Sequence, residues 1–123
     1  VYRTAQRVGL DPTLALAVAY HESGFQQGVV SPVDAIGVMQ VLPSTARALS
    51  DAYGRRLNLL KVEDNVLAGT LLLSQLVRAT GRADLALAGY YQGLGSVRAH
   101  GMLPQTHAYI RNVTALRARF RRG

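Results

Sequence analysis

The segment LALAVAYHESG, residues 14–24, decides the fold of this chain. Its alanine, leucine and valine residues occupy nearly every face of a helix, which is typical of a central helix surrounded by others. Asp11 supplies a carboxylate N-cap and Pro12 a first-turn proline, so we expect a helix over residues 12–22. Gly24 ends it, because glycine is the usual residue where a helix finishes in a left-handed turn.

Apolar periodicity and glycine stops predict further helices along the chain. They are expected at residues 1–8, 43–53, about 64–80, 85–91 and about 106–119, with a short helical turn at 96–100. Gly69, inside one of them, indicates the close approach of another helix. Strand signals are nearly absent, and residues 25–37 are expected to form a folded loop. The fold class is therefore all-α, a compact domain of about six helices.

The composition indicates a single small basic domain. Its 123 residues include 14 Lys or Arg and 7 Asp or Glu, a net charge of +7, and every basic residue except Lys61 is arginine. Such a balance favours contact with a polyanion: nucleic acid, acidic lipid or an anionic cell-wall polymer. The absence of cysteine excludes disulfides and thiolate metal sites. No apolar run approaches the roughly 18 to 20 residues that span a bilayer, so no transmembrane segment is expected.

The carboxylates are few enough to consider one by one. Three stand at expected helix starts, where capping accounts for them: Asp11, Asp84 and Asp64, the last in competition with Asn65. Asp51 and Glu63 have polar neighbours and are expected at the surface, and Asp34 suits a turn better than a site. Glu22 is the one carboxylate left without a structural role.

Glu22 is placed where its pKa should rise. Burial beside Tyr20 and Phe25 disfavours the charged carboxylate, and so does the negative end of its own helix. A carboxylic acid that stays neutral at about pH 6 to 7 is what protonation of a glycosidic oxygen requires. The alternative that the sequence leaves open is an ordinary solvated residue in the last helical turn.

The motifs do not indicate a metal site or a nucleotide-binding site. The pair His21-Glu22 begins like the zinc motif HExxH, but Phe25 stands where the second histidine is needed. His100 and His107 lie apart in the chain. There is no glycine-rich phosphate loop and no helix-turn-helix with a basic recognition face. We therefore expect no metal, no cofactor and no nucleic-acid partner.

Several short motifs together resemble one known family. They are ESGF at 22–25, SP at 31–32, AIGVMQ at 35–40, LPSTA at 42–46, Asn65 with Ala68-Gly69, and ALAGY at 86–90. At this spacing they resemble the catalytic domain of the soluble lytic transglycosylases, family one. The match covers about residues 9–111, and the motifs are specific as a set although each alone is weak. The resemblance implies a lysozyme-like fold of the goose type with a substrate cleft.

The resemblance also implies cleavage of the β-1,4 bond between N-acetylmuramic acid and N-acetylglucosamine in peptidoglycan. Glu22 matches the family's single acid/base, in agreement with the survey of carboxylates. It would protonate the leaving oxygen while the muramyl N-acetyl group stabilises C1, and would then take the C6 hydroxyl proton as a 1,6-anhydro ring closes. Ordinary glycosidases use two carboxylates about 5 to 10 Å apart, and no convincing second one is present. The expected enzyme is a lyase-type transglycosylase.

Other site residues carry over from the resemblance one at a time. Ser31 matches a serine that would contact the N-acetyl group, and Tyr90 matches a tyrosine that would hydrogen-bond the acid. Met39 and Gln40 match residues that line the cleft. A role in core packing stays open for Met39 and for Tyr90. The resemblance places three more residues at the substrate: Tyr91, Gln105 and Tyr109.

Two of these positions depart from the family pattern. The usual AYNAG reads GYYQG at 89–93, so Tyr91 replaces the asparagine and Gln92 the alanine. In the later ETxxYV pattern, Gln105 stands where a substrate-contacting glutamate is usual. The acid/base chemistry survives these changes, whereas the preference of the sugar subsites is affected.

Three alternatives to a transglycosylase follow from the sequence. A muramidase would let water in and form a reducing end. A degenerate peptidoglycan-binding or scaffold module would carry Tyr91 and Gln105 as marks of lost activity, and a basic nucleic-acid binder is supported by net charge alone. The leading prediction is a monomer that acts on peptidoglycan glycan strands in the cell envelope or as a secreted protein. Because the chain opens at Val1, we expect residues 1–123 to be one catalytic domain excised from a longer protein.

Overall fold

A computed structural model describes all 123 residues, which form helices and loops with two isolated β-bridges. The seven helices are α1 (Tyr2–Val8), α2 (Pro12–Ser23), α3 (Pro43–Tyr53), α4 (Val62–Thr80), α5 (Ala83–Gln92), α6 (Leu94–His100) and α7 (Pro104–Arg122). The all-α prediction is confirmed. The number of helices exceeds the expected six because the helical turn expected at residues 96–100 is the complete helix α6.

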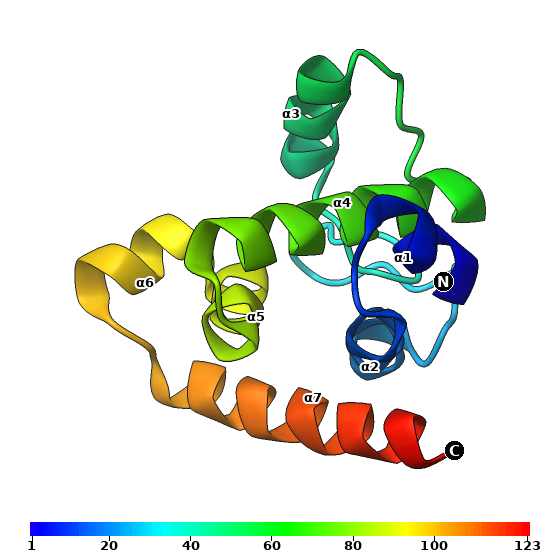
Figure 1. Cartoon of the computed structure of the whole chain (residues 1–123). Helices are drawn as coiled ribbons and strands as arrows, with labels where there is room; N and C mark the ends of the chain where they lie inside the picture. The colour runs from blue at the N-terminus through cyan, green and yellow to red at the C-terminus, as the bar shows by residue number, and fades with distance from the viewer.

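Helix α4 runs through the middle of the molecule, and the other helices are arranged around it and around α2 (Figure 1). α2 lies along α7, while α5 packs against both α4 and α7. α3 projects from the opposite side of α4 (Figure 1). One core of 22 buried residues passes through these layers, and α2 contributes five apolar residues to it: Leu14, Ala15, Ala17, Val18 and Ala19. The prediction of a central α2 is confirmed.

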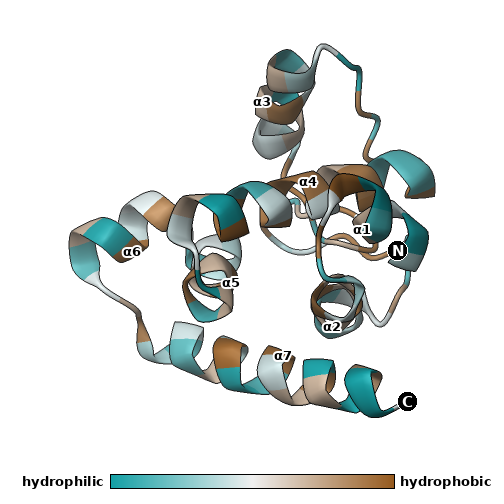
Figure 2. Cartoon of the chain, viewed as in Figure 1, coloured by the Kyte–Doolittle hydropathy of each residue, from teal (hydrophilic) through white to brown (hydrophobic).

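The hydropathy of the residues in α7 agrees with its position at the surface. Figure 2 shows teal, hydrophilic turns along much of α7, with brown residues confined to part of its surface. The buried residues of α7 are Thr106, Tyr109 and Val113, spaced three or four residues apart on one face. α7 is therefore a surface helix that turns one narrow face toward α2 and α5. None of the helices combines the length and the apolar character needed to cross a membrane.

The start of α2 is capped as predicted, whereas two other predicted caps are wrong. Asp11 accepts the Thr13 N–H at 2.9 Å at the head of α2. α4 begins at Val62, so Asp64 lies inside its first turn and accepts the Asn58 N–H at 2.9 Å. An acidic side chain in the first turn also interacts favourably with the helix dipole. An aspartate near a helix start is therefore not always the N-cap, and the sequence alone does not separate the two positions.

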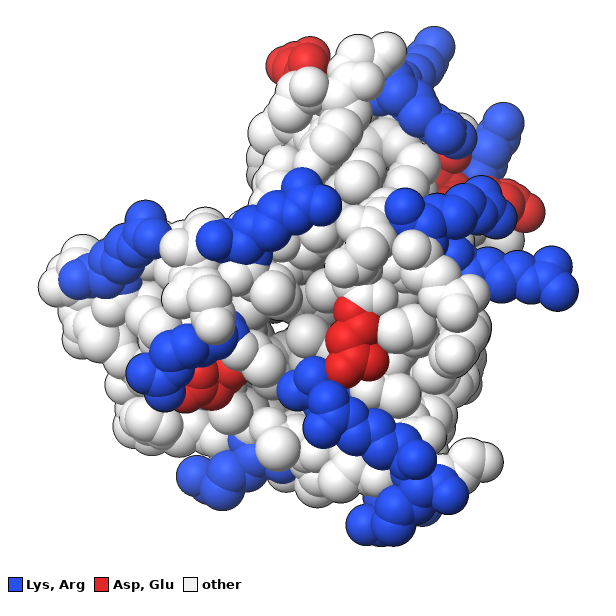
Figure 3. Space-filling model, in the orientation of Figure 1, with Lys and Arg blue, Asp and Glu red and all other residues white.

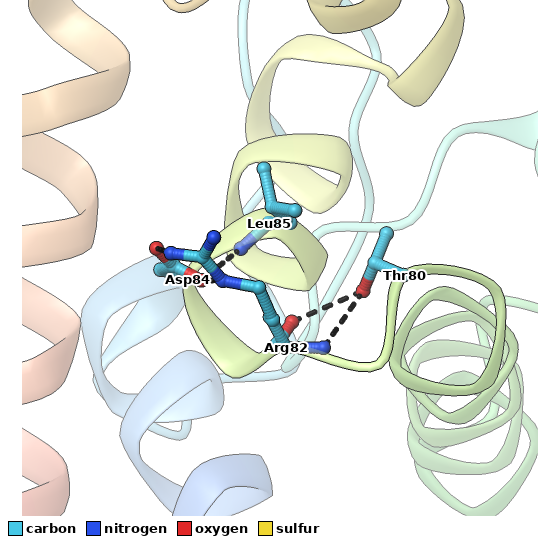
Figure 4. Close-up of polar contacts among 4 residues, drawn as sticks. All are labelled: Thr80, Arg82, Asp84 and Leu85. Atoms are coloured by element: carbon cyan, nitrogen blue, oxygen red, sulfur yellow. Dashed lines mark hydrogen bonds and ion pairs between the residues drawn. The ribbon is translucent and has the colours of Figure 1, made fainter.

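At the junction between α4 and α5, the predicted cap residue again lies inside the helix (Figure 4). α5 begins at Ala83, one residue before Asp84, and Asp84 accepts two hydrogen bonds from Arg82 at 3.0 and 2.7 Å. The Thr80 hydroxyl donates to the Arg82 carbonyl at 3.0 Å across the turn. These contacts fix the short connection that directs α5 back toward α7.

Candidate active site

Glu22 lies in the last turn of α2, where α7 passes beside it. The Tyr109 hydroxyl donates a hydrogen bond of 2.9 Å to Glu22 Oε2, and Tyr109 itself is only 3% exposed. Burial raises the pKa of Glu22 to about 7, although the hydrogen bond from Tyr109 lowers it. The predicted direction is thus confirmed, with burial as its cause. The expected neighbours Tyr20 and Phe25 are themselves 49% and 41% exposed, and the helix end is not among the causes of the shift. At neutral pH a large share of the molecules carries Glu22 in its protonated form.

Three aromatic side chains form a wall beside the acid. The rings of Tyr91 and Tyr109 are stacked, with centroids 4.8 Å apart and planes inclined by 21°. His21 meets Tyr109 edge to face at 5.0 Å. Burial lowers the pKa of His21, which favours the neutral imidazole. We call Tyr91, Tyr109 and His21 the aromatic wall; Tyr91 and His21 are its exposed members, and 48% of the Tyr91 surface is in contact with solvent.

The loop between α2 and α3, residues 24–42, is anchored to α4 by one buried amide. Asn65 Oδ1 accepts the Met39 N–H at 2.9 Å, and Asn65 Nδ2 donates to the carbonyls of Ile36 at 2.7 Å and Leu59 at 3.1 Å. The sequence predicts Asn65 as an alternative helix cap and as part of the family motif. A fully buried amide with three backbone partners instead holds the loop in one conformation.

Two side chains near the end of α2 complete this anchoring. The Ser23 hydroxyl donates to the Val38 carbonyl at 2.7 Å, and the Gln27 side chain accepts the Val38 N–H at 3.2 Å. Gly37, which directly precedes Val38, has a φ of 78°. A Cβ on Gly37 would come within 2.6 Å of Gln27 Oε1. Only glycine fits that position without displacing the loop.

Four expected site residues lie in or against this loop, and the structure gives them different roles. Ser31 lies at a turn, where its hydroxyl accepts the N–H groups of Val33 at 3.2 Å and Ala35 at 3.0 Å. Gln40 donates through its side-chain amide to two loop carbonyls at 2.9 and 3.0 Å. Both side chains are partly buried and shape the loop.

Met39 and Tyr90 differ from the expectation. Met39 is fully buried and packs against Gly69 of α4, so its side chain is part of the core and does not line a cleft. The close approach predicted at Gly69 is therefore made by a loop residue and not by a helix. Tyr90 donates to the Met39 carbonyl at 2.6 Å, and the tyrosine that donates to Glu22 is Tyr109. The reason is the packing of the helices: α7 lies along α2, while the Tyr90 hydroxyl of α5 reaches the loop at Met39. Tyr90 is still near enough to Glu22 for the charge of that carboxylate to help raise the pKa of Tyr90, after burial.

Gln92 connects three helices in a way that the sequence did not predict. Its Nε2 donates to the Ser96 hydroxyl at 2.9 Å and to the Gly101 carbonyl at 3.0 Å. Its Oε1 accepts the Leu103 N–H at 3.1 Å and the Thr106 hydroxyl at 2.7 Å. The first turn of α7, which carries the exposed Gln105, is thereby fixed to the end of α5.

The largest hollow in the structure does not contain Glu22. It measures about 540 Å³ and lies between α3 and residues 56–60, with Arg47, Asp51 and Arg56 among its lining residues. No group of three or more His, Asp or Glu side chains is placed to hold a metal ion.

Residues 1–111 match the model of the transglycosylase SLT domain. This chain belongs to that family. Among curated relatives, the SLT domain is 36% identical to the membrane-bound lytic murein transglycosylase C of Yersinia pestis (strain Pestoides F), across 79% of this chain and 31% of that protein. Its identity to the protein of the same name from Actinobacillus pleuropneumoniae serotype 5b (strain L20) is 32%, across 79% of this chain and 30% of that protein.

Solved structures agree with the family assignment. The 70 kDa soluble lytic transglycosylase of Escherichia coli superposes with a TM-score of 0.84 at 27% identity, covering 97% of this chain and 24% of that chain. An inactive mutant of the Pseudomonas aeruginosa lytic transglycosylase Slt, with glutamine in place of one glutamate, gives 0.84 at 28% identity, covering 94% and 22%. The predicted lysozyme-like fold and family are confirmed. The SLT domain spans less than a third of the length of these relatives.

Proposed function

We propose that this SLT domain is a peptidoglycan lytic transglycosylase that cleaves the β-1,4 bond between N-acetylmuramic acid and N-acetylglucosamine, with Glu22 as its acid and then its base. The observation that carries the proposal is the state of Glu22. It is held in a partly buried position by the Tyr109 hydroxyl, and its pKa is raised to about 7. The relatives are named lytic murein transglycosylases, and one neighbour is inactive when a glutamate becomes glutamine.

In the first step, protonated Glu22 donates its proton to the glycosidic oxygen as the bond to C1 breaks. An acid with a pKa near the working pH is protonated often enough to act and still releases its proton readily. The muramyl N-acetyl group stabilises C1 from the other face of the sugar. The groups that shift the pKa of Glu22 include no second carboxylate, and the proposal therefore assigns this stabilisation to the substrate.

In the second step, ionised Glu22 accepts the C6 hydroxyl proton while the C6 oxygen bonds to C1. The product carries a 1,6-anhydro ring, and Glu22 regains the proton that it lost in the first step. An intramolecular hydroxyl has a high effective concentration at C1, which allows it to outcompete water. The Tyr109 hydroxyl supports the first step, because its hydrogen bond stabilises the carboxylate that forms as Glu22 gives up its proton.

The substrate-binding surface that we propose includes the loop residues Ser31 and Gln40 and the exposed side chains near the start of α7. Ser31 and Gln40 hold the shape of the loop, and Tyr91 and Gln105 are exposed to solvent. The Tyr90 hydroxyl donates a hydrogen bond to the Met39 carbonyl, which fixes that loop to α5. We further propose that residues 1–123 act as a single monomeric domain on glycan strands in the cell envelope.

The positive charge of the domain suits an anionic glycan. Figure 3 shows lysine and arginine side chains spread across several parts of the visible face, with few acidic ones between them. A dispersed charge raises the local concentration of a polyanion without defining a sequence-reading groove. Cleavage should therefore weaken as the salt concentration rises.

The test is digestion of purified peptidoglycan by the wild type and by Glu22→Gln, with product masses recorded. We expect 1,6-anhydromuramyl ends from the wild type and a loss of turnover by a factor of about 100 or more in the variant. Glu63→Gln is the matched control, because Glu63 is an exposed carboxylate in the first turn of α4. Hydrated reducing ends alone would identify a muramidase. Turnover that survives Glu22→Gln would overturn the mechanism.

A further inference from the structure

The exposed ring of Tyr91 has no role in the acid/base chemistry. Tyr90 and Tyr91 are adjacent in the last turn of α5, but they point in different directions. The Tyr90 hydroxyl reaches the Met39 carbonyl, whereas the Tyr91 ring lies on Tyr109 of α7. Tyr91 is 48% exposed even though Tyr109 covers one of its faces. A large aromatic surface is thus presented to solvent in a fixed orientation.

This surface is directly connected to the acid. Tyr91 stacks on Tyr109, and the Tyr109 hydroxyl donates to Glu22, so only one aromatic ring separates Tyr91 from the carboxyl group. Tyr109 is fixed from several sides by Tyr91, His21 and Glu22. Because Tyr91 is already ordered by its stacking partner, binding a ligand on its exposed surface would cost little conformational entropy.

The chemistry of the wall indicates which ligand it suits. Its members are two phenols and an imidazole, and burial lowers the pKa of that imidazole toward the neutral form. The structure gives no ion pair to any of them. An uncharged aromatic face with a negative quadrupole attracts the weakly positive C–H groups on the apolar face of a pyranose ring.

We propose that Tyr91 is a stacking platform for one N-acetylhexosamine ring of the glycan, at the subsite beside Glu22. This inference rests on the proposed function, since it names how that site holds its substrate. Tyr91 binds the sugar through its ring, in a position where the family pattern has asparagine. Its contribution is made equally to the bound substrate and to the transition state, so it acts on KM and leaves kcat nearly unchanged.

The first experiment measures binding without turnover. The probe is chitotetraose, an N-acetylglucosamine oligomer, titrated by calorimetry into Glu22→Gln and into the same variant carrying Tyr91→Leu or Tyr91→Phe. We expect Tyr91→Leu to raise Kd by about tenfold and Tyr91→Phe by less than about threefold, because phenylalanine keeps the ring. Tyr2→Leu, which removes an exposed tyrosine of α1, is the matched control. An unchanged Kd in Tyr91→Leu overturns the proposal.

The second experiment separates stacking from a positioning effect on Tyr109. On peptidoglycan, we expect Tyr91→Leu to raise KM by about tenfold, with kcat within about threefold and an unchanged pH profile. A fall in kcat with a shifted pH profile, at constant KM, would show that Tyr91 acts only through Tyr109 and would overturn the proposal. The outcome is distinct from a failure of the proposed function, because calorimetry with uncut chitotetraose does not depend on turnover.

Discussion

Tyr109 of α7 donates a hydrogen bond of 2.9 Å to Glu22 of α2, across 87 positions of the chain. The two helices lie side by side, so the environment of the acid is set by their packing and not by neighbours in the sequence. Burial favours the neutral carboxylic acid, and the Tyr109 hydroxyl favours the carboxylate. The opposition of these two effects leaves Glu22 able to give and take a proton near neutral pH.

The raised pKa of Glu22 makes the stability of the domain depend on pH. The pKa of the folded state, about 7, lies above the ordinary value of 4.5. The contribution of Glu22 to stability is therefore fully present below about pH 4.5 and is lost as the pH rises through 7. Glu22→Gln imitates the neutral acid, so at about pH 8 the variant should be more stable than the wild type, by on the order of 2 kcal/mol.

Urea denaturation between about pH 4.5 and pH 8.5 measures this difference. The two proteins should be similar in stability at the acidic end and diverge toward the alkaline end. Glu63→Gln removes an exposed carboxylate of α4 and should follow the wild type throughout. Parallel curves for the wild type and Glu22→Gln would show that Glu22 titrates as an ordinary glutamate.

Tyr109→Phe should raise the pKa of Glu22 further, because the lost hydrogen bond is the contact that lowers it. A weaker acid protonates the glycosidic oxygen less readily in the first step, so kcat should fall by about tenfold. The pKa is measured directly by a carbon-13 NMR titration of the Glu22 carboxyl group. Tyr90→Phe is the comparison, since the Tyr90 hydroxyl donates to the Met39 carbonyl, and it should shift the titration less. A larger shift in Tyr90→Phe would reverse the assignment of the two tyrosines.

The sequence predicts those parts of the fold that depend on local signals. α2 has a cap, a first-turn proline, small apolar residues on all faces and a terminal glycine, and the structure forms it over Pro12–Ser23. The sequence also singles out Glu22 as the candidate acid, because it offers a structural role for every other carboxylate; the catalytic role of Glu22 stays a prediction. These conclusions need no knowledge of how distant segments meet.

The contacts around Glu22 depend on distant segments, and there the prediction is less complete. Tyr90 and Tyr109 are both tyrosines on helices, and only the packing of α7 along α2 decides that Tyr109 meets the acid. Asn65 and Gln92 each bind three or four groups in other segments. The family motif draws attention to Asn65, but no local signal predicts its three backbone partners.

Gly69→Ala should destabilise the domain, although alanine favours a helix by about 1 kcal/mol. A Cβ at position 69 would collide with the Met39 side chain, which is fully buried and cannot move outward without shifting the loop. We expect the free energy of unfolding to fall by about 1 to 3 kcal/mol, measured in urea. Gly95→Ala in α6 is the matched control, because nothing lies within 4 Å of a Cβ there, and it should be neutral or stabilising. A stabilised Gly69→Ala would mean that the Met39 contact is loose.

Asp11 connects the start of α2 to the end of α7. One carboxylate oxygen caps α2 through the Thr13 N–H, and the other accepts from Arg117 at 2.6 Å and Arg121 at 3.1 Å. Partial burial alone would raise the pKa of Asp11, but the hydrogen bonds from Arg117, Thr13 and Arg121 hold it well below its usual range. Its contribution to stability is therefore present above the ordinary pKa of 3.8 and is lost as the pH falls.

Asp11→Ala should lower the free energy of unfolding by about 2 kcal/mol at neutral pH, because it removes a helix cap and leaves Arg117 partly buried without its partner. The loss should be smaller at about pH 2, where the unfolded chain is protonated at this position and the wild type has itself lost stability. Urea denaturation at both pH values gives the comparison. Arg119→Ala removes an exposed α7 arginine that has no ion-pair partner and should change stability little at either pH. An equal loss of stability for Asp11→Ala at both pH values would contradict the prediction. It would show that Asp11 stabilises the domain by uncharged packing and not by the ion pair that links α2 to α7.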